Sequence, residues 1–107
     1  MSLCTGDDWE AACRGAGAAS YPYGGSFLAG VCNLGSGTVG TPGTRGDCQS
    51  ASGALDMAGN VAEWVAEGGI RGGSALRTHD GRCSRPERRP AEGFAEDVGY
   101  RCCVATE

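Results

Sequence analysis

The sequence predicts a small α+β domain with little regular secondary structure, held by covalent links more than by an apolar core. Val, Ile, Leu and Phe supply only 14 of the 107 residues, a share that often means disorder. Seven cysteines and a net charge of only −4 argue against disorder. The 20 glycines follow no three-residue period, which excludes collagen. A chain of this length forms one domain, residues 1–107, that needs disulfides or a metal to offset the cost of ordering its backbone.

Composition also excludes several classes of partner. No apolar run approaches the roughly 20 residues that span a bilayer, so we expect no membrane partner. An isoelectric point near 4.9 argues against nucleic acid. The chain does not open on a signal peptide, so a secreted form would have lost its signal or would belong to a longer precursor.

A short helix is predicted near the N-terminus. Thr5 is followed three residues later by Asp8, the pattern of a helix N-cap. The helix then covers Trp9 to Arg14 and stops at Gly15. Trp9 and Cys13 share one face, which should pack inward and place Cys13 where it can be cross-linked.

The remaining elements are short strands between long loops. Residues 15–53 form a long irregular stretch, and loops of this length are uncommon unless they are functional or pinned. Residues 67–69 are a turn signal between two strands, and residues 77–97 are polar and loop-like. Strands are predicted at residues 61–65, 70–76 and 99–104.

The cysteines point to an oxidising compartment, so we expect a secreted, periplasmic or cell-surface protein. Cys32 and Cys48 lie 16 residues apart inside the long irregular stretch, and a bridge between them would pin it. In the chain-entropy model, closing a loop of about that length is worth on the order of 3 kcal/mol. Spacing alone does not settle the full connectivity.

Three segments, taken together, resemble the formylglycine-generating enzyme family, also called sulfatase-modifying factors. The most specific segment reads Asp56-Met-Ala-Gly-Asn-Val-Ala-Glu-Trp64. The other two are Leu3-Cys-Thr-Gly-Asp-Asp-Trp-Glu-Ala-Ala-Cys-Arg-Gly15, and Arg71-Gly-Gly-Ser74 together with Gly99-Tyr-Arg-Cys102. The resemblance implies a truncated, minimal variant of the C-type lectin fold. It covers the C-terminal part of the family's domain and lacks the usual N-terminal half.

The resemblance implies a structural calcium ion. Calcium takes six to eight oxygens from carboxylates and carbonyls, and residues 56–63 are rich in both. The family's ligands correspond to side-chain oxygens of Asp56 and Glu63 and carbonyls of Gly59 and Val61. The alternative is that Asp56 caps a turn and Glu63 lies on a solvated strand. A second family site begins at Asn33, but the acid it needs is not evident downstream.

The resemblance also implies most of the disulfides. Cys102 matches a family cysteine whose partner lies upstream of this chain, so one thiol is left over. A reactive nucleophile is the alternative role for the odd cysteine. Two implied bridges are Cys13–Cys83 and Cys32–Cys48. A third would join Cys4 to one of the two terminal cysteines, Cys103 or Cys102.

Members of the family oxidise a sulfatase cysteine to formylglycine with oxygen and copper(I), which two thiolates hold. In the family these cysteines lie five apart, shortly after the Arg-Gly-Gly-Ser strand. Here that stretch contains only Cys83, and positions five away are Thr78 and Arg88. We therefore expect no copper. Zinc is not expected either, because His79 is the only histidine and Cys-x-x-Cys is absent.

Two hydrolytic chemistries are also possible interpretations of the sequence. Cys83, His79 and Asp80 could form a hydrolase centre, but nothing supplies an oxyanion hole. The acids of the same loop could act as paired carboxylates, although a solvated loop that balances nearby arginines is the simpler interpretation. Those acids are Glu92, Glu96 and Asp97.

Binding is the function that remains. The resemblance places residues 75–97 where lectin-type folds present their binding surface, and their charges with one aromatic suit a peptide or an acidic ligand. The partner is thus a protein, a peptide or a small ligand of unknown identity. An ordinary solvated loop is the alternative. We therefore expect a non-catalytic binding or scaffold module, and the competing hypotheses are a copper-dependent oxidase or an inactive fragment of one. The candidate ligand-binding residues are Arg77, His79, Arg85, Arg88 and Phe94.

Overall fold

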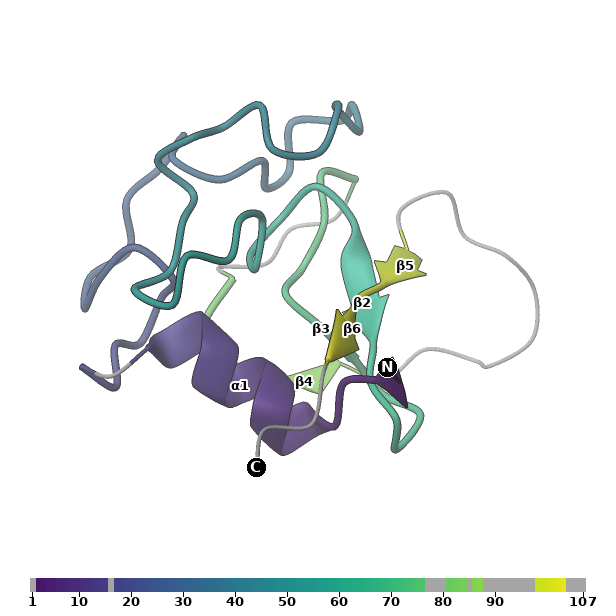
Figure 1. Cartoon of the computed structure of the whole chain (residues 1–107). Helices are drawn as coiled ribbons and strands as arrows, with labels where there is room; N and C mark the ends of the chain where they lie inside the picture. The colour runs from purple at the N-terminus through teal and green to yellow at the C-terminus, as the bar shows by residue number, and fades with distance from the viewer. Residues whose placement is uncertain (1, 16, 77–80, 85, 88–97, 104–107) are drawn as a thin grey trace.

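A computed structural model describes residues 2–15, 17–76, 81–84, 86–87 and 98–103. One helix lies beneath a group of long loops, and short strands gather at one side (Figure 1). The low content of regular structure agrees with the α+β prediction. No helix among the described residues has the length and apolar character needed to cross a membrane. The elements are β1 (Ser2–Leu3), α1 (Gly6–Arg14), β2 (Ala62–Trp64), β3 (Ile70–Arg71), β4 (Pro86–Glu87), β5 (Val98–Tyr100) and β6 (Cys102–Cys103).

Helix α1 has the predicted cap and the predicted stop. The Asp8 amide donates to Thr5 Oγ1 at 3.0 Å, which satisfies one of the free N–H groups of the first turn. Gly15 ends the helix at a φ of 68°, where its amide still bonds the Ala11 carbonyl. The Gly6 amide donates to the carboxylate of Glu67, so a distant turn completes the cap.

A four-stranded mixed sheet has the order β4-β3-β2-β5. Strands β2 and β3 form an antiparallel pair across the predicted turn, whereas β5 runs parallel to β2. The strand predicted over residues 70–76 ends at Arg71. Gly72 and Gly73 have φ values of 99° and 68°, which take the chain out of the extended conformation.

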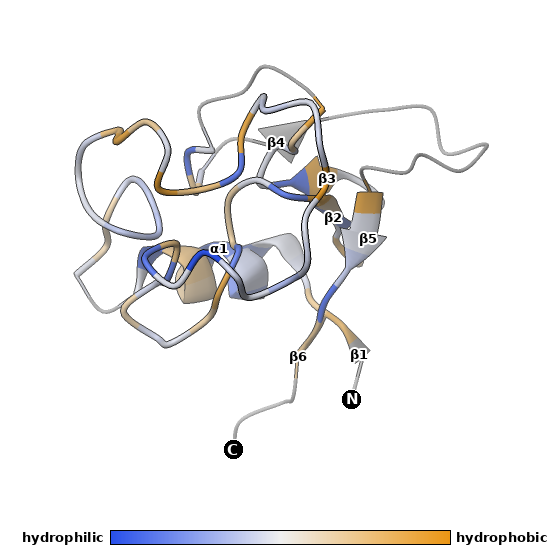
Figure 2. Cartoon of the chain, turned by 90° about the horizontal axis from the view of Figure 1, so that it is seen from above, coloured by the Kyte–Doolittle hydropathy of each residue, from blue (hydrophilic) through white to orange (hydrophobic). Residues whose placement is uncertain are grey.

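The strand predicted over residues 99–104 was also wrong in extent. It is divided at Arg101 into β5, which pairs with β2, and β6, which pairs with β1 in a separate two-stranded sheet. Figure 2 shows β1 and β6 side by side near the two termini. The Cys4 amide donates to the Arg101 carbonyl at 3.3 Å. From Arg101 onward the chain therefore pairs with the N-terminal segment and no longer with β2.

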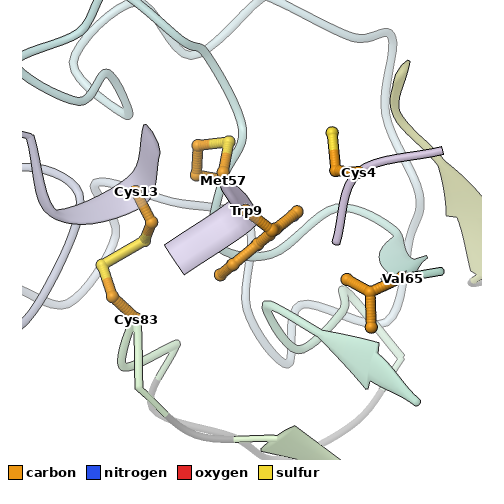
Figure 3. Packing of buried hydrophobic residues seen from close by; sticks show 6 residues of the cluster. All are labelled: Cys4, Trp9, Cys13, Met57, Val65 and Cys83. Atoms are coloured by element: carbon orange, nitrogen blue, oxygen red, sulfur yellow. A yellow bond between two sulfur atoms is a disulfide. The ribbon is translucent and has the colours of Figure 1, made fainter. Parts of the chain in front are cut away.

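The core is small and rich in sulfur, as Figure 3 shows. Trp9 is 1% exposed and lies between the Cys13–Cys83 disulfide on one side and Cys4 and Val65 on the other. The glycine at position 72 permits this packing, because a Cβ there would approach the Met57 carbonyl to 2.9 Å and the indole to 3.3 Å. Sulfur atoms and one indole therefore replace the aliphatic core that the composition lacks.

Three disulfides are present, and they are the pairings that the family resemblance implies. They indicate an oxidising compartment. All seven cysteines lie in the described residues, and Cys102 is the one left as a thiol, exposed at the surface. Of the two terminal cysteines, Cys103 is the one that is bonded to Cys4. The bridges are Cys4–Cys103, Cys13–Cys83 and Cys32–Cys48, with sequence separations of 99, 70 and 16.

Glu10 joins α1 to the sheet and predicts a pH dependence. Its carboxylate accepts from Arg14 Nε at 2.8 Å and from Arg71 Nη1 at 3.2 Å. Burial raises the pKa of Glu10, but the bonds from Arg14 and Arg71 outweigh it and hold the pKa below its ordinary 4.5. A carboxyl with a depressed pKa stabilises the fold above its unfolded pKa, and that contribution is lost as the pH falls through the folded value.

We therefore expect Glu10→Gln to lower the urea midpoint at about pH 6 and to have a smaller effect at about pH 3. The measurement is urea unfolding of both proteins across this range. Asp47→Asn, which changes an exposed acid outside the helix, is the control. An equal deficit for Glu10→Gln at both pH values would contradict the assignment.

Candidate functional site

The segment from Leu55 to Glu63 forms a tight turn that leads into β2. Asp56, Gly59 and Asn60 have φ values of 56°, 78° and 61°, all in the left-handed region. The Gly59 amide donates to the Gly72 carbonyl at 2.7 Å. A Cβ at position 59 would come within 2.6 Å of the Asn33 carbonyl oxygen, so only glycine fits there. Backbone contacts from two distant segments therefore shape this turn.

The structure brings the four predicted calcium ligands to one place. Asp56, Gly59, Val61 and Glu63 all line one open pocket of about 380 Å³. These residues fit a calcium ion by their chemical type, because a hard cation binds carboxylate oxygens and backbone carbonyls. The rest of the pocket lining is Pro42, Gly43, Leu55, Asn60, Tyr100 and Arg101.

Glu63 is buried, with 5% of its surface exposed, so the alternative that placed it on a solvated strand is wrong. Its Oε1 accepts from Trp9 Nε1 at 2.8 Å and from Arg101 Nε at 2.9 Å. Its Oε2 accepts from Arg101 Nη2 at 3.0 Å. This carboxylate therefore ties the helix to β2 and to the segment that joins β5 to β6.

Asp56 and Arg101 complete the charges of the pocket. Asp56 Oδ2 accepts from the Gly43 amide at 2.7 Å, so Asp56 also holds the long loop. Arg101 Nη2 donates to the Leu55 carbonyl at 2.7 Å. The hydrogen bond to Glu63 raises the pKa of Arg101 above its ordinary value, against the effect of burial and with help from the charges of Glu63 and Asp56. The guanidinium therefore stays charged.

The region of the second family calcium site is organised by two amides. Asn33 Nδ2 donates to Asn60 Oδ1 at 3.1 Å and to the Thr38 carbonyl at 3.0 Å. Asn60 Oδ1 also accepts from the Gly40 amide at 2.7 Å, and Asn60 Nδ2 donates to the Gly40 carbonyl at 3.1 Å. The Asn33 amide group is thus engaged in holding the loop against the turn at Asn60.

A family model described as the sulfatase-modifying factor enzyme 1-like domain, FGE-sulfatase, matches residues 1–106. The chain belongs to this family. No curated protein matches the chain with significance.

Family membership fits the way in which the motifs meet in space. The Asp56–Trp64 segment supplies β2, and the Arg71–Ser74 segment begins in its antiparallel neighbour β3. The Gly99–Cys102 segment begins in the parallel neighbour β5 and carries Arg101 to Glu63. The N-terminal segment supplies Trp9, which bonds the same carboxylate. Three of these segments therefore meet at one partly buried ion pair, Glu63 with Arg101, and the Arg71–Ser74 segment lies beside it in the sheet.

The cysteines bear on the family's reaction. Cys83 follows the Arg71–Ser74 segment and is bonded to Cys13 in the core. Cys102 is the free thiol of the chain. Among the described residues, no group of three or more His, Cys, Asp or Glu side chains could hold a metal ion. The candidate calcium site is of a different kind, because two of its four ligands would be backbone carbonyls and only two would be side chains.

The candidate ligand-binding residues lie outside the described residues, as do the histidine and the acids of the two hydrolytic alternatives. The structure describes the anchors of this segment. The Ala75 amide donates to the Asn60 carbonyl at 2.9 Å, and the Cys83 amide donates to the Ser20 carbonyl at 2.8 Å. The residues in question are Arg77, His79, Asp80, Arg85, Arg88, Glu92, Phe94, Glu96 and Asp97.

Sequence reasoning missed two residues of the site. Arg101 was noticed as part of the Gly99–Cys102 motif but was given no role. Trp9 was expected in the core, yet its indole N–H proved to be a partner of Glu63. The available signal was a glutamate flanked by apolar residues in the strand predicted at residues 61–65. Such a carboxylate needs a partner if the fold buries it, because an unpaired buried carboxylate is costly.

Proposed function

We propose that this chain is a non-catalytic binding or scaffold module of the formylglycine-generating enzyme family. Its fold is a minimal C-type-lectin-like frame, stabilised by disulfides and calcium and exposed to an oxidising extracellular or periplasmic medium. The observation that carries the proposal is the state of the cysteines. Six of them are paired, and the seventh, Cys102, stands alone.

The chemistry of copper(I) explains why this observation matters. The family's oxidase holds copper(I) with two thiolates, and a soft ion of this kind selects thiolate ligands. In this chain Cys83 belongs to a buried structural bridge, so its sulfur is not available as a thiolate. A single exposed thiol at Cys102 provides one ligand where the reaction needs two.

The test is a copper(I) titration of the oxidised chain together with incubation of a Cys-x-Pro-x-Arg peptide in oxygenated buffer. We expect no stoichiometric tight copper binding and no peptide aldehyde detectable by mass spectrometry. Cys102→Ser serves as the matched control for non-specific binding at the surface thiol. Copper-dependent formation of the aldehyde would overturn the proposal in favour of the oxidase.

Calcium is the second part of the proposal. Asp56 and Glu63 would supply carboxylate oxygens, and Gly59 and Val61 would supply carbonyls, since all four line one pocket. Bound there, the ion would cross-link the turn to β2. With Arg101 included, the side chains of the pocket carry a net charge of −1. We therefore expect a weak site, in the range of about 10⁻⁴ to 10⁻³ M that is typical of extracellular modules.

Calcium is expected to raise the thermal midpoint of the chain, because a ligand that binds only the folded state stabilises it. At a calcium concentration of about ten times Kd, the gain in unfolding free energy is about 1.4 kcal/mol. Differential scanning fluorimetry with calcium, magnesium and a chelator measures the effect. Asp56→Asn should abolish the shift, whereas Asp47→Asn, an exposed acid outside the pocket, should leave it intact. A calcium shift that survives Asp56→Asn would place the ion elsewhere.

The ligand surface is the third part of the proposal and concerns residues 75–97. The support is a frame that anchors this segment at Ala75 and Cys83 and returns it to the sheet at β5. Arginines with one aromatic in such a segment suit an acidic peptide. Binding of an acidic peptide library, measured on the parent and on the double variant Arg77→Ser with Arg88→Ser, tests it. Equal retention by both proteins would argue for an ordinary solvated loop.

A further inference from the structure

Arg101 lies in the pocket proposed to bind calcium. It lines the same pocket as the four candidate calcium ligands. It bonds both oxygens of Glu63 and the carbonyl of Leu55, at distances from 2.7 to 3.0 Å. The arginine therefore already joins the two ends of the turn between Leu55 and Glu63, which is the mechanical task of a structural metal ion.

The bonds to Glu63 limit what a metal ion could take from this carboxylate. Each carboxylate oxygen has about two acceptor positions. Trp9 and Arg101 use both positions of Oε1, and Arg101 uses one position of Oε2. An ion could therefore reach Glu63 only through the remaining position of Oε2, with a guanidinium on the same carboxylate. The positive charge of Arg101 would repel a divalent ion at this distance.

We propose that Arg101 is the resident counter-cation of this turn. It neutralises Glu63 so that the turn folds without calcium, and it keeps the calcium affinity of the pocket low. This inference rests on the calcium part of the proposed function. It treats arginine and calcium as two cations that share one carboxylate, so removal of the first should strengthen binding of the second.

Two properties should change in opposite directions in Arg101→Gln. Without calcium, the variant should unfold at lower temperature, because Glu63 loses its charged partner while it remains buried. With calcium, the affinity should increase by about tenfold or more, because a repelling charge has gone and both oxygens of Glu63 regain acceptor positions. A merely structural role for Arg101 would weaken calcium binding, so the direction of the change separates the two interpretations.

The experiment is isothermal titration of calcium into the parent chain and Arg101→Gln, with thermal unfolding in chelator for both. Arg14→Gln is the matched control, because Arg14 also pairs with one glutamate but lies on the helix outside the pocket. The control should keep the calcium affinity of the parent. If Arg101→Gln folds only when calcium is present, the inference is supported in its strongest form.

The outcomes separate this inference from the calcium proposal. Tighter binding by Arg101→Gln than by the parent supports both. Calcium binding by the parent that is unchanged or weaker in Arg101→Gln overturns the role of Arg101 and leaves the calcium site standing. No calcium binding by either protein overturns both.

A second variant covers the case in which Arg101→Gln does not fold under any condition. Arg101→Lys keeps the positive charge while it loses the two-pronged contact with the carboxylate. Its calcium affinity should then stay within about threefold of the parent, since the repelling charge remains. A tenfold increase in affinity with the charge retained would overturn the inference.

Discussion

Replacing Cys13 and Cys83 together with alanine is expected to remove a large fraction of the free energy of unfolding of the chain. The bridge closes a loop with a sequence separation of 70, and both sulfurs are fully buried beside Trp9. In the chain-entropy model a loop of this size is worth on the order of 4 kcal/mol. The total stability of a domain of this size is only about 5–15 kcal/mol, so this loss is a large fraction of it.

Urea unfolding followed by tryptophan fluorescence measures the effect, with one-dimensional proton NMR as the check on folding. The pair Cys32 and Cys48 provides the comparison, because its loop is shorter and ties a segment without helix or strand. Its removal should cost on the order of 3 kcal/mol. If the two double variants were equally stable, the central role assigned to the Cys13–Cys83 bridge would be wrong.

Trp9→Ala is expected to lower the free energy of unfolding by about 3–5 kcal/mol. The indole is the largest fully buried side chain of the described residues, and few apolar neighbours could collapse into its space. The substitution also removes the N–H that bonds Glu63 at 2.8 Å. The cavity and the lost hydrogen bond act together, so this single change should destabilise the chain as much as the loss of a disulfide.

Trp9→Phe helps to separate the two contributions, because it keeps a buried aromatic ring, leaves a smaller cavity than alanine and removes the donor. We expect it to cost about 1–3 kcal/mol, the penalty of a buried acceptor that loses a partner. Trp64, which is half-buried in β2, remains as the fluorescent probe in both variants. A loss of less than about 1 kcal/mol for Trp9→Ala would show that the sulfur-rich cluster is not the true core.

If the proposed non-catalytic role holds, the family's frame persists in this chain apart from the oxidation chemistry. The motif residues are used here for structure: Trp9, Glu63 and Arg101 hold one another, and Cys13 and Cys83 hold the helix to the loop after β3. None of these contacts needs a thiolate pair. The use of six cysteines as cross-links is the observation on which the proposed non-catalytic role rests.

Local features could be predicted from the residues themselves. The Thr5 cap and the Gly15 stop of the helix depend on neighbouring residues, and both were confirmed. Residues 61–65 were expected to form a strand, and β2 lies inside them. The poverty of large aliphatic side chains and the number of cysteines indicated a cross-linked, loop-rich domain. Helix caps, turn glycines and composition act over a few residues or over the whole chain, so they are visible without a structure.

Apart from the disulfide pairings, which the family resemblance implied, the tertiary structure decided the features that depend on distant partners. Arg101 interrupts the last strand because its carbonyl pairs with Cys4 and its side chain reaches Glu63, which is 38 residues away. Strand β1 exists only because β6 lies beside it, since a pattern of two residues is too short to predict a strand. The burial of Glu63 is likewise a property of its surroundings. The physical reason is that a short strand or a buried charge gains its free energy from long-range partners, and the local sequence does not say which partners the fold will bring.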